Sequence, residues 1–257
     1  MHNDTPIFEL KNVTRHFGTF PAVTNVNLQI WPGERVALVG PSGAGKSTLI
    51  NLLNGTLLPS SGQVWVLGQN LAELSPGALK RVQQQVGTIY QQFNLVDNLR
   101  VIHNVNAGHL GRWSFLKAVV SLAWPLDTAT ASAALAQVGI PEKLYERTDQ
   151  LSGGEQQRVA IARVLVQQPQ AILADEPISS LDPERSREVM DLLRDLNKQT
   201  GKTLVTSLHN IDFARSHCRR IVGLRQGQVL FDTPVAEITS EMIGELYKIW
   251  MWITLPE

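Results

Sequence analysis

A glycine-rich segment, GPSGAGKST at residues 40–48, constrains the fold of this chain more than any other feature of the sequence. It follows the apolar run RVALVG, which is typical of a buried strand, and it leads directly into KSTLINLLNG. There, Leu49, Leu52 and Leu53 fall on one helical face, and Gly55 supplies a stop signal. The pattern G-x-x-x-x-G-K-[ST] binds phosphate when it lies between a strand and a helix. The sequence therefore predicts an α/β fold with a phosphate site at the start of this helix.

The residue types of this loop suit a nucleoside triphosphate with Mg²⁺. Glycines let the backbone wrap closely, so that its N–H groups point at phosphate oxygens beside the positive end of the helix. Lys46 is expected to neutralise the β and γ phosphates, and the Ser47 hydroxyl to ligate Mg²⁺. An ordinary glycine-rich turn is the alternative, but the full pattern arises by chance in only about one percent of chains this long. The ATP-binding residues predicted in the loop are Gly40, Pro41, Ser42, Gly43, Ala44, Gly45, Lys46, Ser47 and Thr48.

The remaining hydrophobic pattern predicts a mostly parallel sheet flanked by helices. Strands are indicated by ELKNV, by the alternation of Val26, Leu28 and Ile30, and by GQVWVLG, VGTIY, AILAD, TLVTSL, RIVGL and GQVLFD. We expect an antiparallel portion near the N-terminus. Strand signals disappear between Asn98 and Gln150, where Ala, Leu and Val recur at helical spacing in ATASAALAQVGI. The prediction is a single domain over residues 1–257, with a helical subdomain inserted over roughly residues 98–165.

Composition and charge exclude several classes of function. Lys and Arg number 23, as do Asp and Glu, so no overall basic field favours nucleic acid as a partner. The first residues, MHNDTPIFELKNV, resemble neither a signal nor a transit peptide, which predicts a cytoplasmic protein. The single cysteine, Cys218, excludes an internal disulfide and is expected simply to pack. The most apolar region, residues 115–124, is shorter than the roughly 20 residues that cross a bilayer, so any membrane role requires a partner.

The segment AILADEP at residues 171–177 is an apolar strand that ends in two carboxylates. Asp175 is expected to hold the metal through water, as the second group directed at Mg²⁺. Glu176 would then orient and deprotonate the attacking water. Alone, such a pair is more often a solvated strand end. In a chain that also carries the phosphate loop, the catalytic interpretation is favoured.

The stretch LSGGEQQRVAIAR at residues 151–163 resembles the signature of ABC ATPases. Its opening residues Ser152, Gly153, Gly154 and Glu155 begin a helix, so they present a hydroxyl and backbone amides as a second anion-binding N-terminus. Glu155 stands where glutamine is commonest in the family. The resemblance covers nearly the whole chain and implies a P-loop NTPase fold of the ABC ATPase type. It also implies that the signature acts on the ATP of a second copy of the subunit, so that two chains enclose two nucleotides.

The same resemblance assigns further positions. Gln91 matches the glutamine that contacts Mg²⁺ and senses the membrane subunit, with Gln92 as the alternative, and His209 matches the switch histidine that contacts the γ phosphate. Phe17 stands where an aromatic ring, usually tyrosine, stacks on adenine, and His16 is the alternative. The resemblance thus implies Lys46, Gln91, Glu176 and His209 as catalytic residues and Ser47, Gln91 and Asp175 around the metal. The loop expected at the dimer interface is SSLD, that is Ser179, Ser180, Leu181 and Asp182.

Several segments resemble the phosphonate-importer branch of the family, namely QQFNLV, GRWSFLKAVVSLAWP, ILADEPISSLDPERSREVM and HCRRIVGLRQGQVLFD. The partners this implies are permease subunits and a periplasmic or lipid-anchored substrate-binding protein, with the chain peripheral on the inner face of the cell membrane. Phosphite, phosphate or another small oxyanion would fit nearly as well. A soluble ABC-type regulatory protein, or a component of a carbon–phosphorus lyase complex, is the alternative function.

Two segments are left with open interpretations. We expect residues 91–124 to contact the permease; alternatively, Trp113, Phe115 and Trp124 fill the core of the helical subdomain. The aromatic C-terminal segment IWMWITLPE is expected to form a helix packed on the domain.

Overall fold

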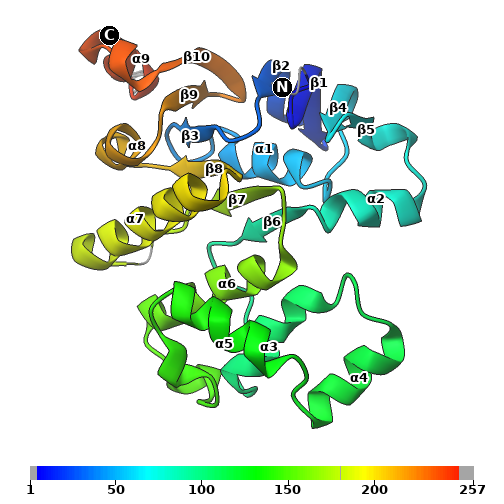
Figure 1. Ribbon diagram of the computed structural model, residues 1–257. Helices are drawn as coiled ribbons and strands as arrows, with labels where there is room; N and C mark the ends of the chain where they lie inside the picture. The colour runs from blue at the N-terminus through cyan, green and yellow to red at the C-terminus, as the bar shows by residue number, and fades with distance from the viewer. Residues whose placement is uncertain (1–4, 180, 249–257) are drawn as a thin grey trace, which may run out of the picture.

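The computed structural model describes residues 5–179 and 181–248 and contains two sheets (Figure 1). The smaller sheet is antiparallel, as expected near the N-terminus, with strand order β2-β1-β4-β5. Its strands are β1 (Phe8–Phe17), β2 (Phe20–Ile30), β4 (Ser61–Val66) and β5 (Gln69–Asn70). Ser180 and the C-terminal segment at residues 249–257 lie outside the described residues.

The larger sheet has the order β10-β9-β3-β8-β7-β6 and carries the segments predicted as buried strands. Its strands are β3 (Arg35–Val39), β6 (Val86–Ile89), β7 (Ala171–Asp175), β8 (Thr203–Leu208), β9 (Arg220–Arg225) and β10 (Gln228–Pro234). All neighbouring pairs are parallel except β9 and β10. The prediction of a mostly parallel core is confirmed. Antiparallel pairing is not confined to the N-terminal part, because the short turn between β9 and β10 brings the chain straight back.

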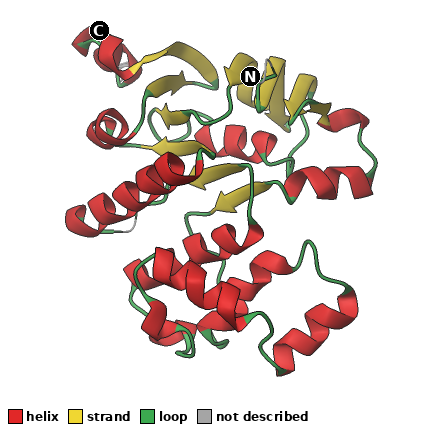
Figure 2. Cartoon of the chain, viewed as in Figure 1, coloured by secondary structure: helices red, strands yellow, loops and turns green. Residues whose placement is uncertain are grey.

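Helices cover the larger sheet (Figure 2). The helix after the glycine-rich loop ends at Leu53, and its residues Leu49, Leu52 and Leu53 are fully buried, as their spacing predicts. Gly55 follows with φ +70°, the left-handed conformation expected of a helix stop. The helices of this part are α1 (Lys46–Leu53), α2 (Pro76–Gln83), α7 (Pro183–Thr200), α8 (Ile211–His217) and α9 (Ser240–Leu246), with 3₁₀ turns η1 (Leu71–Glu73) and η5 (Val235–Glu237).

The chain between β6 and β7 folds into helices that lie at the lower end of the molecule in Figure 1. Helix α6 packs on both α3 and α5 and runs back toward the sheet. The elements are α3 (Val101–Asn106), η2 (Ala107–His109), α4 (Phe115–Ala123), α5 (Thr128–Gln137), η3 (Pro141–Lys143), η4 (Thr148–Gln150) and α6 (Gly153–Gln167). The helical periodicity read from the sequence here corresponds to real helices.

Cys218 is buried, as expected, and burial raises the pKa of its thiol to about 12. Within residues 5–179 and 181–248, no helix combines the length and the apolar character that spanning a bilayer requires. The apolar segment from the sequence forms α4, which has nine residues.

Candidate functional site

The parallel register gathers the predicted chemical groups at one edge of the larger sheet. Val39 pairs with Leu208, Asp175 with Ser207, and Ile89 with Ala174, so these strands end together. The residues that follow them in the chain therefore emerge at the same edge, which is where parallel α/β sheets bind ligands. These residues are Gly40, Glu176, His209 and the segment Tyr90 to Gln92.

Two glycines of the loop, Gly40 and Gly45, lie so close to neighbouring backbone that a side chain would not fit. A Cβ atom on Gly40 would lie 2.1 Å from the carbonyl oxygen of Leu224, and one on Gly45 would lie 2.6 Å from that of Ala22. Gly45 also has φ +101°, at the point where α1 begins. Only glycine therefore fits at these two positions, where the backbone follows the close turn typical of a phosphate cradle.

Lys46 lies within this cradle and is only 4% exposed. Its ammonium donates hydrogen bonds to the carbonyl oxygens of Gly40, at 2.8 Å, and Pro41, at 3.0 Å. Burial lowers its pKa, while the carboxylates of Glu176 and Asp175 act in the opposite direction. A positive charge is thus held at the start of α1, near the carboxylates of Asp175, the last residue of β7, and Glu176, which follows it.

Asp175 joins the loop to the neighbouring strand. Its Oδ1 accepts hydrogen bonds from the hydroxyl of Ser47, at 3.0 Å, and from that of Ser207, at 2.7 Å. Hydroxyl and carboxylate oxygens are ligands that suit Mg²⁺, so Ser47 and Asp175 fit the predicted metal site in position and chemistry. Ser207 was missed from the sequence. Its signal was a hydroxyl in the buried strand β8, two residues before His209.

Glu176 adopts a conformation that few residues other than glycine tolerate, with φ +48°. Its backbone N–H donates to Ser207 Oγ at 2.8 Å, and its Oε1 lies 2.5 Å from His209 Nε2. His209 is held in turn by Tyr247, whose hydroxyl donates to the His209 carbonyl at 2.7 Å. Backbone conformations of this kind persist where the surroundings hold them, often at functional sites. No sequence signal connected Tyr247 with His209, which it reaches only through the fold.

Gln91 and Gln92 are exposed in the loop that follows β6. This loop is bound by Arg163 of α6, whose guanidinium donates to the carbonyl oxygens of Phe93, at 2.7 Å, and Asn94, at 2.6 Å. Burial lowers the pKa of Arg163. Arg163 is the last residue of the signature stretch in the sequence, so the signature helix is tied directly to the glutamine loop. Its role had not been recognised from the sequence.

The signature residues form a second group, at the N-terminus of α6. Ser152 and Glu155 make a reciprocal capping box, in which the Ser152 N–H and hydroxyl both donate to Glu155 Oε2 at 2.8 Å. These bonds from Ser152, together with an ion pair to Lys143 at 3.2 Å, lower the pKa of Glu155. Gly154 lies against Arg185 in the first turn of α7.

The loop predicted at the dimer interface connects the two groups. Ser179 donates to the carbonyl oxygen of Glu176 through both its N–H, at 3.2 Å, and its hydroxyl, at 3.1 Å. Asp182 caps α7 by accepting from the Arg185 N–H at 3.0 Å, and it pairs with the Arg185 guanidinium at 3.3 Å. Ser179 therefore contacts Glu176, and Asp182 binds the same Arg185 that lies against Gly154.

The aromatic residues predicted near adenine lie at the tip of the β1–β2 hairpin. Phe17 pairs with Phe20 across the turn, and the two side chains are 46% and 60% exposed. The Arg15 guanidinium stacks 4.9 Å from the centre of the Phe17 ring. Beside Phe17, the His16 N–H donates to Ser60 Oγ at 3.1 Å. Phe20, the more exposed ring, was not considered from the sequence.

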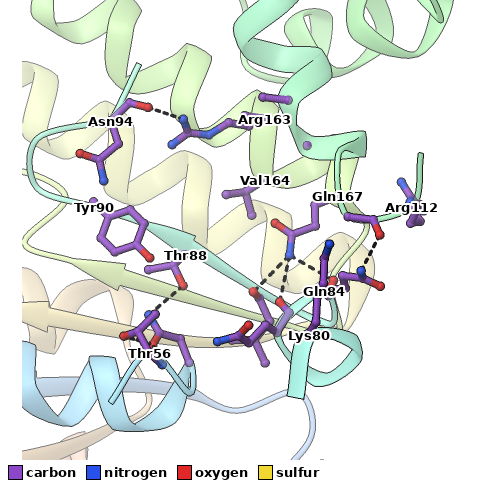
Figure 3. A pocket seen from close by; sticks show the side chains of 16 residues that line it. Thr56, Lys80, Gln84, Thr88, Tyr90, Asn94, Arg112, Arg163, Val164 and Gln167 are labelled. Atoms are coloured by element: carbon purple, nitrogen blue, oxygen red, sulfur yellow. Dashed lines mark hydrogen bonds between the residues drawn. The ribbon is translucent and has the colours of Figure 1, made fainter. Parts of the chain in front are cut away.

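A cavity of about 470 Å³ separates α2 and β6 from the helical part of the chain (Figure 3). It is lined by Tyr90 after β6, by Arg163 and Gln167 of α6, by Lys80 of α2 and by Arg112. Gln167 donates to the carbonyl oxygens of Gln84, at 3.0 Å, and Val86, at 3.2 Å, and so fastens α6 to the end of α2. Because Tyr90 lines the cavity, the cavity adjoins the loop that carries Gln91.

The aromatic residues around α4 divide between two environments. Trp113 is half-buried and stacks on His109 with ring centres 4.8 Å apart. Phe115 and Trp124 are 85% and 74% exposed. The alternative that all three fill a core is therefore wrong for Phe115 and Trp124, whereas Trp113 is partly covered by His109.

Comparison with known proteins identifies this arrangement. The family model described as ABC transporter matches residues 23–179. The phosphonates import ATP-binding protein PhnC of Rhizobium johnstonii is 46% identical over 94% of this chain and 86% of its own length. The protein PhnC 3 of Halalkalibacterium halodurans is 45% identical over 94% of both chains.

Solved structures agree with the sequence relatives. The dimeric ATP-binding cassette MJ0796, in a post-hydrolysis state bound to ADP and phosphate, superposes with a TM-score of 0.77. It is 34% identical and covers 89% of this chain and 98% of its own. The CbiO1 protein of Clostridium perfringens, part of an ABC transporter complex, gives a TM-score of 0.78 at 27% identity, over 96% of this chain and all of its own. The chain therefore belongs to the ABC transporter family, as an ATP-binding cassette of that family.

Proposed function

We propose that this chain hydrolyses ATP to power an ABC importer for a phosphonate or a related phosphorus oxyanion. The observation that carries the proposal is the row of hydrogen bonds from Ser47 through Asp175 and Ser207 to Glu176 and His209, beside the buried Lys46. The substrate class rests on the names of relatives about 45% identical over most of the chain, each a phosphonates import ATP-binding protein.

In this proposal the loop of residues 40–48 binds the phosphates of ATP with its amides, and Lys46 neutralises the β and γ phosphates. Mg²⁺, held by Ser47 and through water by Asp175, with Gln91 as a further contact, would add positive charge at the transferred phosphate. Glu176 accepts a proton from the water whose oxygen forms the new bond to the γ phosphorus, while the bond to the β-phosphate oxygen breaks. His209 orients the Glu176 carboxylate and contacts the γ phosphate.

The proposed assembly contains two copies of the chain with their permease subunits, and a periplasmic or lipid-anchored binding protein acts through the permease. Ser152, Gly153, Gly154 and Glu155 of one copy meet the ATP of the other, with residues 179–182 at the interface between copies. The dimeric, ADP-bound relative supports this arrangement. The phosphonate is bound by the other subunits, so the chain works as a peripheral protein on the cytoplasmic face of the membrane.

We expect the permease to contact residues 91–124, beside the cavity that adjoins Gln91. Arg163 and Gln167 connect this cavity to the signature helix, so a change in its shape reaches the residues proposed to act on ATP. Crosslinkers on surface positions near Arg112 should capture a permease subunit. Crosslinks to the second ATPase copy alone would contradict this placement.

Two substitutions test the proposed chemistry. Lys46→Ala should abolish hydrolysis and weaken ATP binding, because the phosphates lose their main cation in a confined site.

Glu176→Gln should still bind ATP and accumulate as an ATP-bound dimer. It should hydrolyse ATP at least about 10²–10⁴-fold more slowly, because the base is lost. Both are measured by phosphate release and by light scattering with ATP. Lys198→Ala, which removes an exposed lysine on α7, is the control and should behave as wild type. Normal turnover by either site variant would refute its assigned role.

A further inference from the structure

Helix α4 turns four large apolar side chains away from the protein. Phe115, Leu116, Val119 and Val120 are 85%, 72%, 47% and 44% exposed, and Trp124 directly follows the helix at 74%. The spacing of these positions places them along one side of the helix. Ser121 is buried instead, and its hydroxyl donates to the Ala118 carbonyl at 2.7 Å. This polarity is the reverse of an ordinary surface helix, whose apolar side faces the core.

The apolar side is held in a defined position. Ser114 caps α4 by accepting from the Lys117 N–H at 3.4 Å. The Lys117 ammonium lies 4.6 Å above the Trp113 ring and pairs with Asp127 at 3.2 Å. Since Trp113 itself stacks on His109, the first turn of α4 is anchored to the helical part. In Figure 1, α4 lies at the far end of the molecule from the N-terminal sheet.

The part of the chain around α4 is basic, although the whole chain is neutral. Residues 74–127 contain two acidic residues, Asp97 and Asp127, of which Asp127 pairs with Lys117. They also contain five cations, which are Lys80, Arg81, Arg100, Arg112 and Lys117. Lys80 and Arg81 are exposed on α2, which faces the helical part across the cavity, and Arg112 precedes α4. An apolar helix face within a basic region matches an anionic lipid surface in both polarity and charge.

We propose that α4 rests on an anionic phospholipid bilayer, with Phe115, Leu116, Val119 and Val120 in the boundary between headgroups and acyl chains. Trp124 at the end of the helix suits this depth, because tryptophan concentrates at membrane interfaces. With nine residues, α4 lies in the plane of the interface and does not cross it. The contact depends on the proposed import function only in that the permease brings the chain to a membrane. A single short helix binds weakly, and the permease would strengthen the contact by raising the local concentration of lipid.

Vesicle flotation tests the proposal with the purified full chain, without nucleotide and without permease. The chain is mixed with an excess of vesicles of phosphatidylcholine alone or with about 30% phosphatidylglycerol, and binding to the anionic vesicles should be at least about tenfold stronger. The double variant Leu116→Asp with Val120→Asp should lower that binding at least about tenfold. Its matched control, Leu58→Asp with Leu230→Asp, changes two exposed leucines outside the helical part and should bind as wild type. Circular dichroism verifies that each variant is folded.

A second readout locates the contact. Val119→Cys is labelled with a fluorophore, which Cys218 escapes because it is buried, and brominated phosphatidylcholine in the anionic vesicles should quench it. Equal flotation of wild type and the Leu116→Asp, Val120→Asp variant would overturn the proposal, as would an unquenched label. The proposal would also be overturned if the wild-type chain bound neither kind of vesicle, which is the result expected if α4 contacts only a permease. Hydrolysis by the same samples in solution separates this inference from the proposed ATPase function, since α4 takes no part in that chemistry.

Discussion

At the scale of single residues, Phe17 and Phe20 are the two candidates for the proposed contact with adenine. Phe17 is already stacked by Arg15 on one face, whereas Phe20 is more exposed on the same hairpin. We predict that Phe17→Ala raises the ATP concentration for half-maximal hydrolysis by roughly five- to 150-fold, since stacking a base on an aromatic ring contributes about 1–3 kcal/mol. Phe17→Tyr should be nearly silent.

The neighbouring residues provide the controls for this prediction. Phe20→Ala and His16→Ala should leave the half-maximal concentration unchanged if Phe17 holds the base. If Phe20→Ala raised the half-maximal ATP concentration strongly and Phe17→Ala did not, the adenine contact would be assigned to Phe20 instead. Equal affinity for ATP and for base-free triphosphate would exclude stacking at either ring.

At the scale of elements, α6 depends on the capping box at its N-terminus. Ser152→Ala removes the side-chain half of that box and should lower stability by about 1 kcal/mol, and the melting temperature by about 2–4 °C for a chain of this size. Calorimetry measures the change. Asp182→Ala, which removes the corresponding cap of α7, serves as the comparison, and an unchanged melting temperature for both variants would contradict the capping argument.

The charge of Glu155 adds a pH dependence to the same element. Hydrogen bonds from Ser152 and the ion pair with Lys143 hold the pKa of Glu155 below its ordinary value of 4.5. Its stabilising contribution is therefore complete above pH 4.5 and is lost as the pH falls through the lower pKa of the folded state. The difference in melting temperature between wild type and Glu155→Gln should accordingly be constant near neutral pH and shrink in acid. A difference that grew with acidity would show the opposite sign of the shift.

At the scale of the whole molecule, the proposed site combines the two groups of residues from two chains. Ser152→Arg should bind ATP and hydrolyse none, because a bulky cation replaces the donor that closes the partner's site. In a heterodimer of Ser152→Arg with Lys46→Ala, one interface joins two intact halves and the other joins two damaged halves. Hydrolysis should return to at most about half of the wild-type rate, because a two-fold dimer has two equivalent sites.

The activity of verified mixed dimers tests whether each ATP site is shared between two chains. If they remain inactive with ATP bound at the intact interface, independent composite sites are excluded. Hydrolysis of ATP by the Ser152→Arg variant as a monomer would show that the site is not shared between two chains.

Much of the fold and of the candidate site could be predicted from local sequence patterns. The sequence directly predicted the strand, glycine loop and helix around residues 40–55. It also predicted the buried strand that ends at Asp175 and the helical character of residues 98–165. These features depend on hydrophobic periodicity and on the phosphate-loop motif, which both involve residues close together in the chain. The family resemblance supplied Gln91, His209 and the signature, since their spacing alone carries little information.

The tertiary structure decided what depends on residues far apart in the chain. Parallel register brought Ser207 onto Asp175, the final helix carried Tyr247 to His209, and α6 carried Arg163 to the loop of Gln91. It also decided that the apolar side of α4 faces outward, although periodicity alone would place such a face in the core. Sequence pattern records which residues share a face, but only the packing of whole elements determines what that face meets.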